Sequence, residues 1–192
     1  MPTESISCAF ADLPLTVGDI IIKAESRFAE IKHRRIQGSV YVEGFCSQFV
    51  LENLHITKGR LQIAGGCFQG KLSGIFVDEC QDAKEPAILV GDGAGTICTT
   101  LTLERIWTRW AKTWGIRVTN QTSLTAIGLA ADVCGIGGIQ CVSAHGTYVG
   151  LNCESNPIGV WFYDCTASVS GHNWADNQTP VRVSGGNVDI RP

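Results

Sequence analysis

The sequence predicts an all-β protein, a parallel β-helix (solenoid) of about eight coils. Three observations lead to this fold class. A short motif of alternating apolar residues returns every 20 to 28 residues along the chain. Glycine is abundant, with 22 copies in 192 residues, where about 7% is usual. Charged residues make up 17% of the chain, where about a quarter is usual.

Each element of the first ladder is a small or turn residue followed by apolar, any and apolar residues. The first apolar positions of its eight copies are Ile20, Val40, Leu61, Ile88, Ile116, Ile139, Val160 and Val181. A second ladder, also with period two, lies between these copies. Its pairs are Ala29/Ile31, Phe49/Leu51, Ile75/Val77, Leu101/Leu103, Ile127/Leu129, Val149/Leu151, Ala167/Val169 and Val188/Ile190. Alternation with period two is typical of strands that bury one face.

Strands of one type that return at a fixed period of about 20 residues favour a solenoid over a sandwich. Equivalent strands then stack about 4.8 Å apart and fill a common apolar bore. Inward positions exclude ions, and corners favour residues that tolerate positive φ, which would account for low charge and high glycine. We expect residues 1–17 to form an N-terminal segment or cap and residues 18–192 to form the β-helix domain. The two longest intervals place extra loops at 78–85 and 91–100, the first places to look for a functional patch.

Two stretches carry a resemblance to known proteins. Leu51–Ile56 followed by Gly59–Ile63, and Leu101–Trp107 followed by Gly115–Asn120, resemble right-handed parallel β-helices of the pectin-lyase-like class. Within that class the pattern looks most like short β-helical segments of bacteriophage tail spikes and other virion appendages. The resemblance extends from about residue 18 to residue 190 and implies an architecture, because no motif specific to one family accompanies it.

Composition excludes several classes of partner. The formal charge is −3, and residues 32–35 are the longest basic cluster, which argues against nucleic-acid binding. The chain opens without a basic, apolar leader, and the apolar run at 20–22 is too short to span a bilayer. We therefore expect synthesis in a cytoplasm and no membrane insertion. No C-x-x-C motif occurs, and we expect neither a metal nor a cofactor.

Catalytic patterns are weak. A glycosidase needs two carboxylates about 5 to 10 Å apart. Asp92 and Asp164 each follow the first apolar residue of their coil by four positions, but their coils are three apart, which is too far for such a pair. His145, in Ala-His-Gly, is the nearest match to the Gly-His-Gly motif of polygalacturonase-like enzymes, whose Asn-Thr-Asp and Arg-x-Lys elements are missing. We expect His145 to be a corner residue and the protein not to be an enzyme.

One segment departs from strand periodicity. Trp107, Trp110 and Trp114 stand at i, i+3 and i+7, which would place them on one face of a short helix beside Arg109. Exposed tryptophan suits sugar rings and protein interfaces, so these four residues are the candidate interface or glycan-binding site. The alternative is that one or two tryptophans cap the apolar bore or fill a seam between subunits.

The nine cysteines suggest contact with an oxidant. Cys46 and Cys67 each follow the first apolar residue of their coil by six positions, so they should stack within the range that a disulfide accepts. The alternative is a stack of reduced thiols that pack as small apolar side chains. Because the number is odd, at least one cysteine must stay free or pair with another chain, and Cys8 is our candidate for an intermolecular bond.

These observations favour a structural component of a bacteriophage virion: a β-helical spike, fibre tip or decoration protein, made in the host cytoplasm and located in the virion. The cysteines fit this role, because a chain made in a cytosol would meet an oxidant once the virus particle that contains it is released from the cell. A solenoid also needs its ends covered, so we expect a homotrimer, contacts with other virion proteins and contact with host surface polysaccharide. Two alternatives remain: a polysaccharide depolymerase, lyase or hydrolase, of the same fold, and a bacterial surface adhesin module.

Overall fold

The computed structural model describes residues 10–91 and 96–192. In these ranges the chain forms strands and no helix, as the sequence predicts. The strands are β1 (Leu15–Val17), β2 (Ile20–Ile22), β3 (Glu30–Val42), β4 (Val50–Ile63), β5 (Lys71–Asp78), β6 (Ile88–Val90), β7 (Cys98–Thr99), β8 (Thr102–Arg109), β9 (Trp114–Asp132), β10 (Gly137–Glu154), β11 (Ile158–Asn173) and β12 (Thr179–Arg191).

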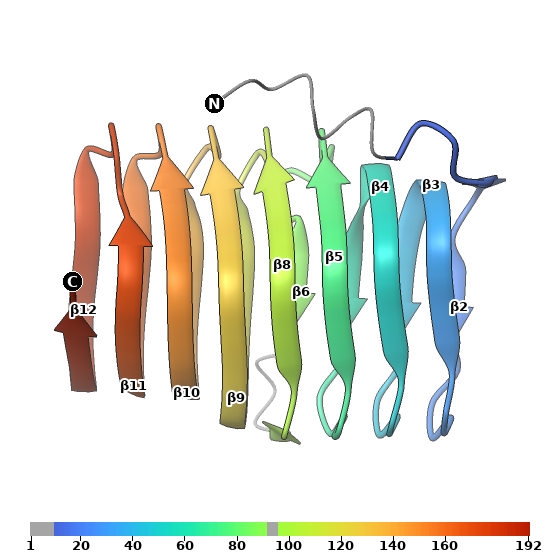
Figure 1. The fold of residues 1–192 in the computed structure, drawn as a ribbon, viewed down its shortest axis with the longest axis horizontal. Helices are drawn as coiled ribbons and strands as arrows, with labels where there is room; N and C mark the ends of the chain where they lie inside the picture. Colours follow the sequence, from blue (N-terminus) through green and yellow to red (C-terminus); the bar gives the residue numbers. More distant parts are fainter. Residues whose placement is uncertain (1–9, 92–95) are drawn as a thin grey trace.

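All strand pairs are parallel, and successive coils lie side by side along the long axis (Figure 1). The order runs β1-β3-β4-β5-β8-β9-β10-β11-β12, while β2, β6 and β7 pair with members of this row. This arrangement confirms a parallel β-solenoid. Strand β1 lies inside the segment 1–17 and pairs with β3 from Leu15 onward.

The first ladder of the sequence is a single stack in the structure. Cα pairing joins Ile20 to Val40, Val40 to Leu61, and so on through all eight predicted positions to Val181. Most of these side chains are fully buried because each is covered by its equivalents on the neighbouring coils.

The second ladder is only partly right, because each complete coil has a third strand segment that the sequence pattern merges with the second. Ile75 and Val77 pair with Leu54 and Ile56, one segment later than their assigned stack. Ile127 and Val149 point outward and are 43% and 38% exposed. A bend at a positive-φ residue separates the two segments, so strict alternation breaks there.

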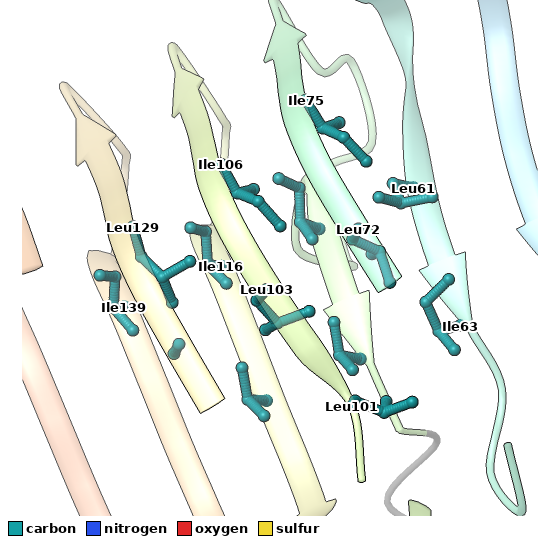
Figure 2. Packing of buried hydrophobic residues seen from close by; sticks show 14 of the residues in the cluster. Leu61, Ile63, Leu72, Ile75, Leu101, Leu103, Ile106, Ile116, Leu129 and Ile139 are labelled. Atoms are coloured by element: carbon teal, nitrogen blue, oxygen red, sulfur yellow. The ribbon is translucent and has the colours of Figure 1, made fainter. Parts of the chain in front are cut away.

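The core is the bore of the solenoid. Figure 2 shows side chains from the first stack, including Leu61, Ile116 and Ile139, facing side chains of the other segments, including Leu72, Leu103 and Ile106. These residues belong to one continuous hydrophobic cluster that runs from Ile22 to Val169.

Glycine has a different role from the expected one at several positions. Among the described residues, nineteen non-glycine residues adopt positive φ, against ten glycines. At other glycines close packing forbids a side chain: a Cβ at Gly137 would lie 2.3 Å from the ring of Trp114, and one at Gly70 would lie 2.3 Å from the ring of Phe49. Close approach between coils therefore explains part of the glycine content.

The loop at 79–87 joins β5 to β6 and folds onto Arg60, whose guanidinium lies 3.4 Å from Asp82 and 3.7 Å from Glu85. Residues 92–95 of the second expected loop lie outside the described residues. None of the described segments is a helix long and apolar enough to cross a membrane.

Candidate functional site

The predicted tryptophan helix is wrong. Trp107 and Arg109 lie in β8, Trp110 is a corner residue with φ of 56°, and Trp114 begins β9. Parallel pairing with β5 makes this segment a strand. The pairing buries Leu103, Ile106 and Thr108 in stacks that a helix would break.

Trp107 belongs to a row of outward-facing rings. His55, Phe76 and Trp107 occupy equivalent positions on β4, β5 and β8. Phe76 stacks on both neighbours, with ring centroids 5.0 Å from His55 and 4.6 Å from Trp107. Parallel coil spacing sets this contact, since outward side chains one coil apart are close enough to stack.

Arg109 completes the cluster. Its Nε and Nη2 donate to the two carboxylate oxygens of Asp78 at 3.0 and 3.1 Å. The same guanidinium lies 5.6 Å from the ring centroid of Trp107 and 4.2 Å from that of Trp110. Both distances are in cation–π range. Arg109 thereby joins the ring row to the corner at Trp110.

Two titratable groups of this cluster are shifted by burial. Asp132 accepts a hydrogen bond from Trp107 Nε1 at 2.8 Å, and its other oxygen is buried without a partner among the described residues. Desolvation raises the pKa of Asp132. Burial lowers the pKa of His55, although Asp78 lies 4.0 Å from its Nε2 and acts in the opposite direction.

Residues 10–14 cover this row. The ring of Phe10 lies 5.4 Å from His55 and 6.5 Å from Phe76, and Arg35 donates to the carbonyl of Ala11. Phe76 is consequently 2% exposed. Of the four predicted residues, Trp110 is the most exposed, at 46%.

Two exposed apolar residues that sequence reasoning missed lie in the corner of the coil next to Trp110. Val133, on the next coil, is 50% exposed with φ of 54°, and Ile136 is 46% exposed. We call Trp110, Val133 and Ile136 the Trp corner. It lies at the upper edge in Figure 1, where β8 and β9 end.

A second apolar corner lies at the opposite edge. Phe28, Phe45 and Phe68 are 69%, 61% and 39% exposed, in the loops that precede β3, β4 and β5 at the lower edge in Figure 1. We call these residues the Phe corner. Each precedes a strand of the second ladder, so a search for apolar residues at predicted corners could have found them.

Trp114 is separate from the other predicted residues. It is 3% exposed, covers Gly137 and lies 6.1 Å from the ring of Trp161. Arg182 lies over the other ring, with its Cζ 4.7 Å from the centroid of Trp161. The sequence spacing that joins Trp114 to Trp107 therefore does not bring them together, because a corner and a new strand intervene.

Cys46 and Cys67 stack as predicted, and Cys98 continues their column. All three side chains are buried, and each Sγ donates to a backbone carbonyl 3.2 to 3.5 Å away on the preceding coil. Desolvation raises the pKa of Cys67 to about 12. The disulfide between Cys46 and Cys67 stays a prediction, and Cys8 lies outside the described residues.

His145 lies beside a hollow of about 450 Å³. Its Nδ1 accepts a hydrogen bond from the backbone N–H of Thr166 at 3.0 Å. The other lining residues are Ser123, Gly146, Thr147, Thr166, Ala167, Ser168, Asn187 and Asp189. Asp189 is the one acid among them, and Asp164 does not line the hollow, so a carboxylate pair is missing from this part of the described chain.

Within the described ranges, His, Cys, Asp and Glu side chains nowhere gather in a group that could hold a metal ion. Comparison with known proteins gives no match, whether to family models, to curated proteins or to solved structures.

Proposed function

We propose that this protein is a structural component of a bacteriophage virion, a β-helical spike, fibre tip or decoration protein that assembles as a homotrimer and contacts host glycan. The virion assignment rests on the sequence resemblance and on the cysteine argument. The assembly role rests on one observation, the large apolar residues at exposed corners with positive φ.

Phe28 and Phe45 adopt φ of 57° and 62°, and Trp110 and Val133 adopt similar values. A bulky side chain in this region costs on the order of 1 kcal/mol, and exposure gives little burial in return. Most other corners with positive φ carry polar residues or glycine. Folding does not favour aromatic residues at these positions, whereas a protein interface does.

The geometry of the Phe corner also suits rotational assembly. Its residues lie on three successive coils but at different positions of the corner: Phe68 pairs with Ser47, Phe28 lies one position later and Phe45 two positions earlier. Around a symmetry axis parallel to the solenoid axis, this edge meets its own equivalents on other copies. Residues 44–49 and 64–70 contain no charged side chain, which favours burial of this edge around Phe45 and Phe68, whereas the loop with Phe28 carries Lys23, Glu25 and Arg27.

The test replaces the rings with the residue that the backbone prefers. The double change Phe28→Gly and Phe45→Gly removes strain and apolar surface together, so the monomer should stay folded while the oligomer dissociates. Light scattering should give a mass near three times 20.6 kDa for the wild type and near 20.6 kDa for the variant. The exposed Tyr163, changed to Ser, is the matched control and should remain trimeric.

If the variant keeps the mass of the wild type, the Phe corner is not part of the interface. The same double change at Trp110 and Val133 then tests the Trp corner. If both double variants kept the mass of a trimer, the assembly role of the corners would be excluded.

A further inference from the structure

The hollow beside His145 arises from a step in the solenoid. Two successive coils have a corner of two residues at this place. It consists of Thr99 and Thr100 in one coil and of Thr122 and Ser123 in the next. In the following coil one residue, His145, fills the same corner, and the register shifts between Ala144 and Gly146. The last two coils keep the shorter corner. The edge recedes after Ser123 and leaves a concave surface.

This surface presents hydroxyl groups that have no internal partner. The side-chain hydroxyls of Ser123, Thr147, Thr166 and Ser168 make no hydrogen bond within the described chain, although all four line the hollow. Thr147 and Ser168 are outward positions of adjacent strands β10 and β11, held in register by parallel pairing. Such hydroxyls can both donate and accept.

His145 adds an oriented donor. Because Nδ1 accepts from the Thr166 N–H, the hydrogen of the neutral ring is on Nε2. The hydrogen bond to the backbone also fixes the plane of the imidazole against the next coil. Gly146 and the nearly buried Ala167 supply an apolar floor between these polar groups.

The charge of the lining limits the ligand. Asp189 is the one charged residue that lines the hollow, and it accepts a hydrogen bond from Arg191 Nε at 2.8 Å. No lysine or arginine is among the lining residues, and Arg191 beside them is already paired with Asp189, which disfavours an anionic sugar.

From these observations we propose that the hollow is a subsite for an uncharged sugar ring. A pyranose presents an apolar C–H face to the floor and hydroxyls to the polar rim, and the hollow has the size of a small-molecule site. The proposal deepens the glycan contact of the proposed function and names the sugar class. It does not depend on the oligomeric state.

The experiment follows amide resonances of the full chain during titration with maltotriose, mannotriose and α-1,4-linked galactotriose. Trigalacturonate, the acidic counterpart of the last, is the charge control. We expect at least one neutral trisaccharide to shift the resonances of 145–147, 166–168 and 187–189 saturably, with millimolar affinity. Trigalacturonate should bind at least about tenfold more weakly. The proposal is wrong if no neutral probe shifts these residues at about 50 mM, or if trigalacturonate binds as well.

Two matched variants separate the subsite from the surface in general. Thr147→Val removes one lining hydroxyl at nearly constant volume and should weaken binding roughly three- to tenfold. Thr102→Val makes the same change in the same outward column, two coils away and outside the hollow, and should leave binding unchanged. Equal losses in both variants would contradict the assignment.

The titration is repeated with the Phe28→Gly and Phe45→Gly variant. Binding that survives in a monomer supports the subsite on its own. Loss of binding in a folded monomer would contradict a subsite contained in one chain, whatever the mass measurement shows about assembly.

Discussion

At the scale of single residues, desolvation controls the chemistry of the thiols. The eight described cysteines are all buried, and burial raises the pKa of Cys67 and of Cys134 to about 12. The thiolate is the reactive form, so these side chains should be inert at neutral pH.

We therefore expect Ellman's reagent to label at most one thiol per native chain at pH 8 and none in a Cys8→Ser variant. After denaturation without reductant, nine reactive thiols in the wild type would identify the stack as reduced. A denatured count of seven would instead reveal one disulfide, and rapid native labelling of several thiols would contradict the burial.

Asp132 gives a prediction on pH. Because its pKa is raised in the folded protein, folding disfavours its charged form, and its unfavourable contribution grows as the pH rises above the ordinary carboxyl value of about 3.9. Asp132→Asn keeps an acceptor for Trp107 Nε1 and should raise the free energy of unfolding at pH 7. Urea denaturation should show the gain fading toward pH 3. A variant less stable than the wild type at pH 7 would contradict this assignment.

At the scale of elements, polar side chains inside corners hold adjacent coils together. Asn156 is 1% exposed and accepts a hydrogen bond from the N–H of Cys134 at 2.8 Å. Its amide donates to the carbonyls of Ala131 and Glu154 and to Asn177 Oδ1. One side chain thus satisfies backbone groups that the corner would otherwise leave buried and unpaired.

Asn156→Ala should lower the free energy of unfolding by about 1–3 kcal/mol, because it leaves the buried Cys134 N–H without an acceptor. Asn173→Ala is the control, since Asn173 is exposed and donates to Asn152, and should change stability by less than about 0.5 kcal/mol. Similar effects of the two changes in urea denaturation would show that the asparagine is not needed to satisfy the corner.

The elements also show what could be read from the sequence. Period two and a fixed repeat were enough to place Ile20 and its seven equivalents in one stack, because inward positions admit little besides apolar side chains. The bend at Gly128 was not readable, since the same bend in other coils carries Asn53 or Arg105. The helix expected for Trp107–Trp114 was wrong because long-range strand pairing outweighs local spacing.

At the scale of the whole molecule, the candidate sites follow from how corners stack. The Phe corner needs the loops of successive coils in line, and the hollow needs a one-residue step between two coils. Neither is a local motif, so the sequence indicated the types of residue and not their arrangement. The aromatic residues with positive φ at the surface are the features that burial in the core does not explain.

The central claim, that this solenoid is an assembly component, is tested most directly by the mass of the wild-type chain in solution. Light scattering at micromolar concentration should give a stable species near three times 20.6 kDa. A stable monomer under the same conditions would contradict the claim.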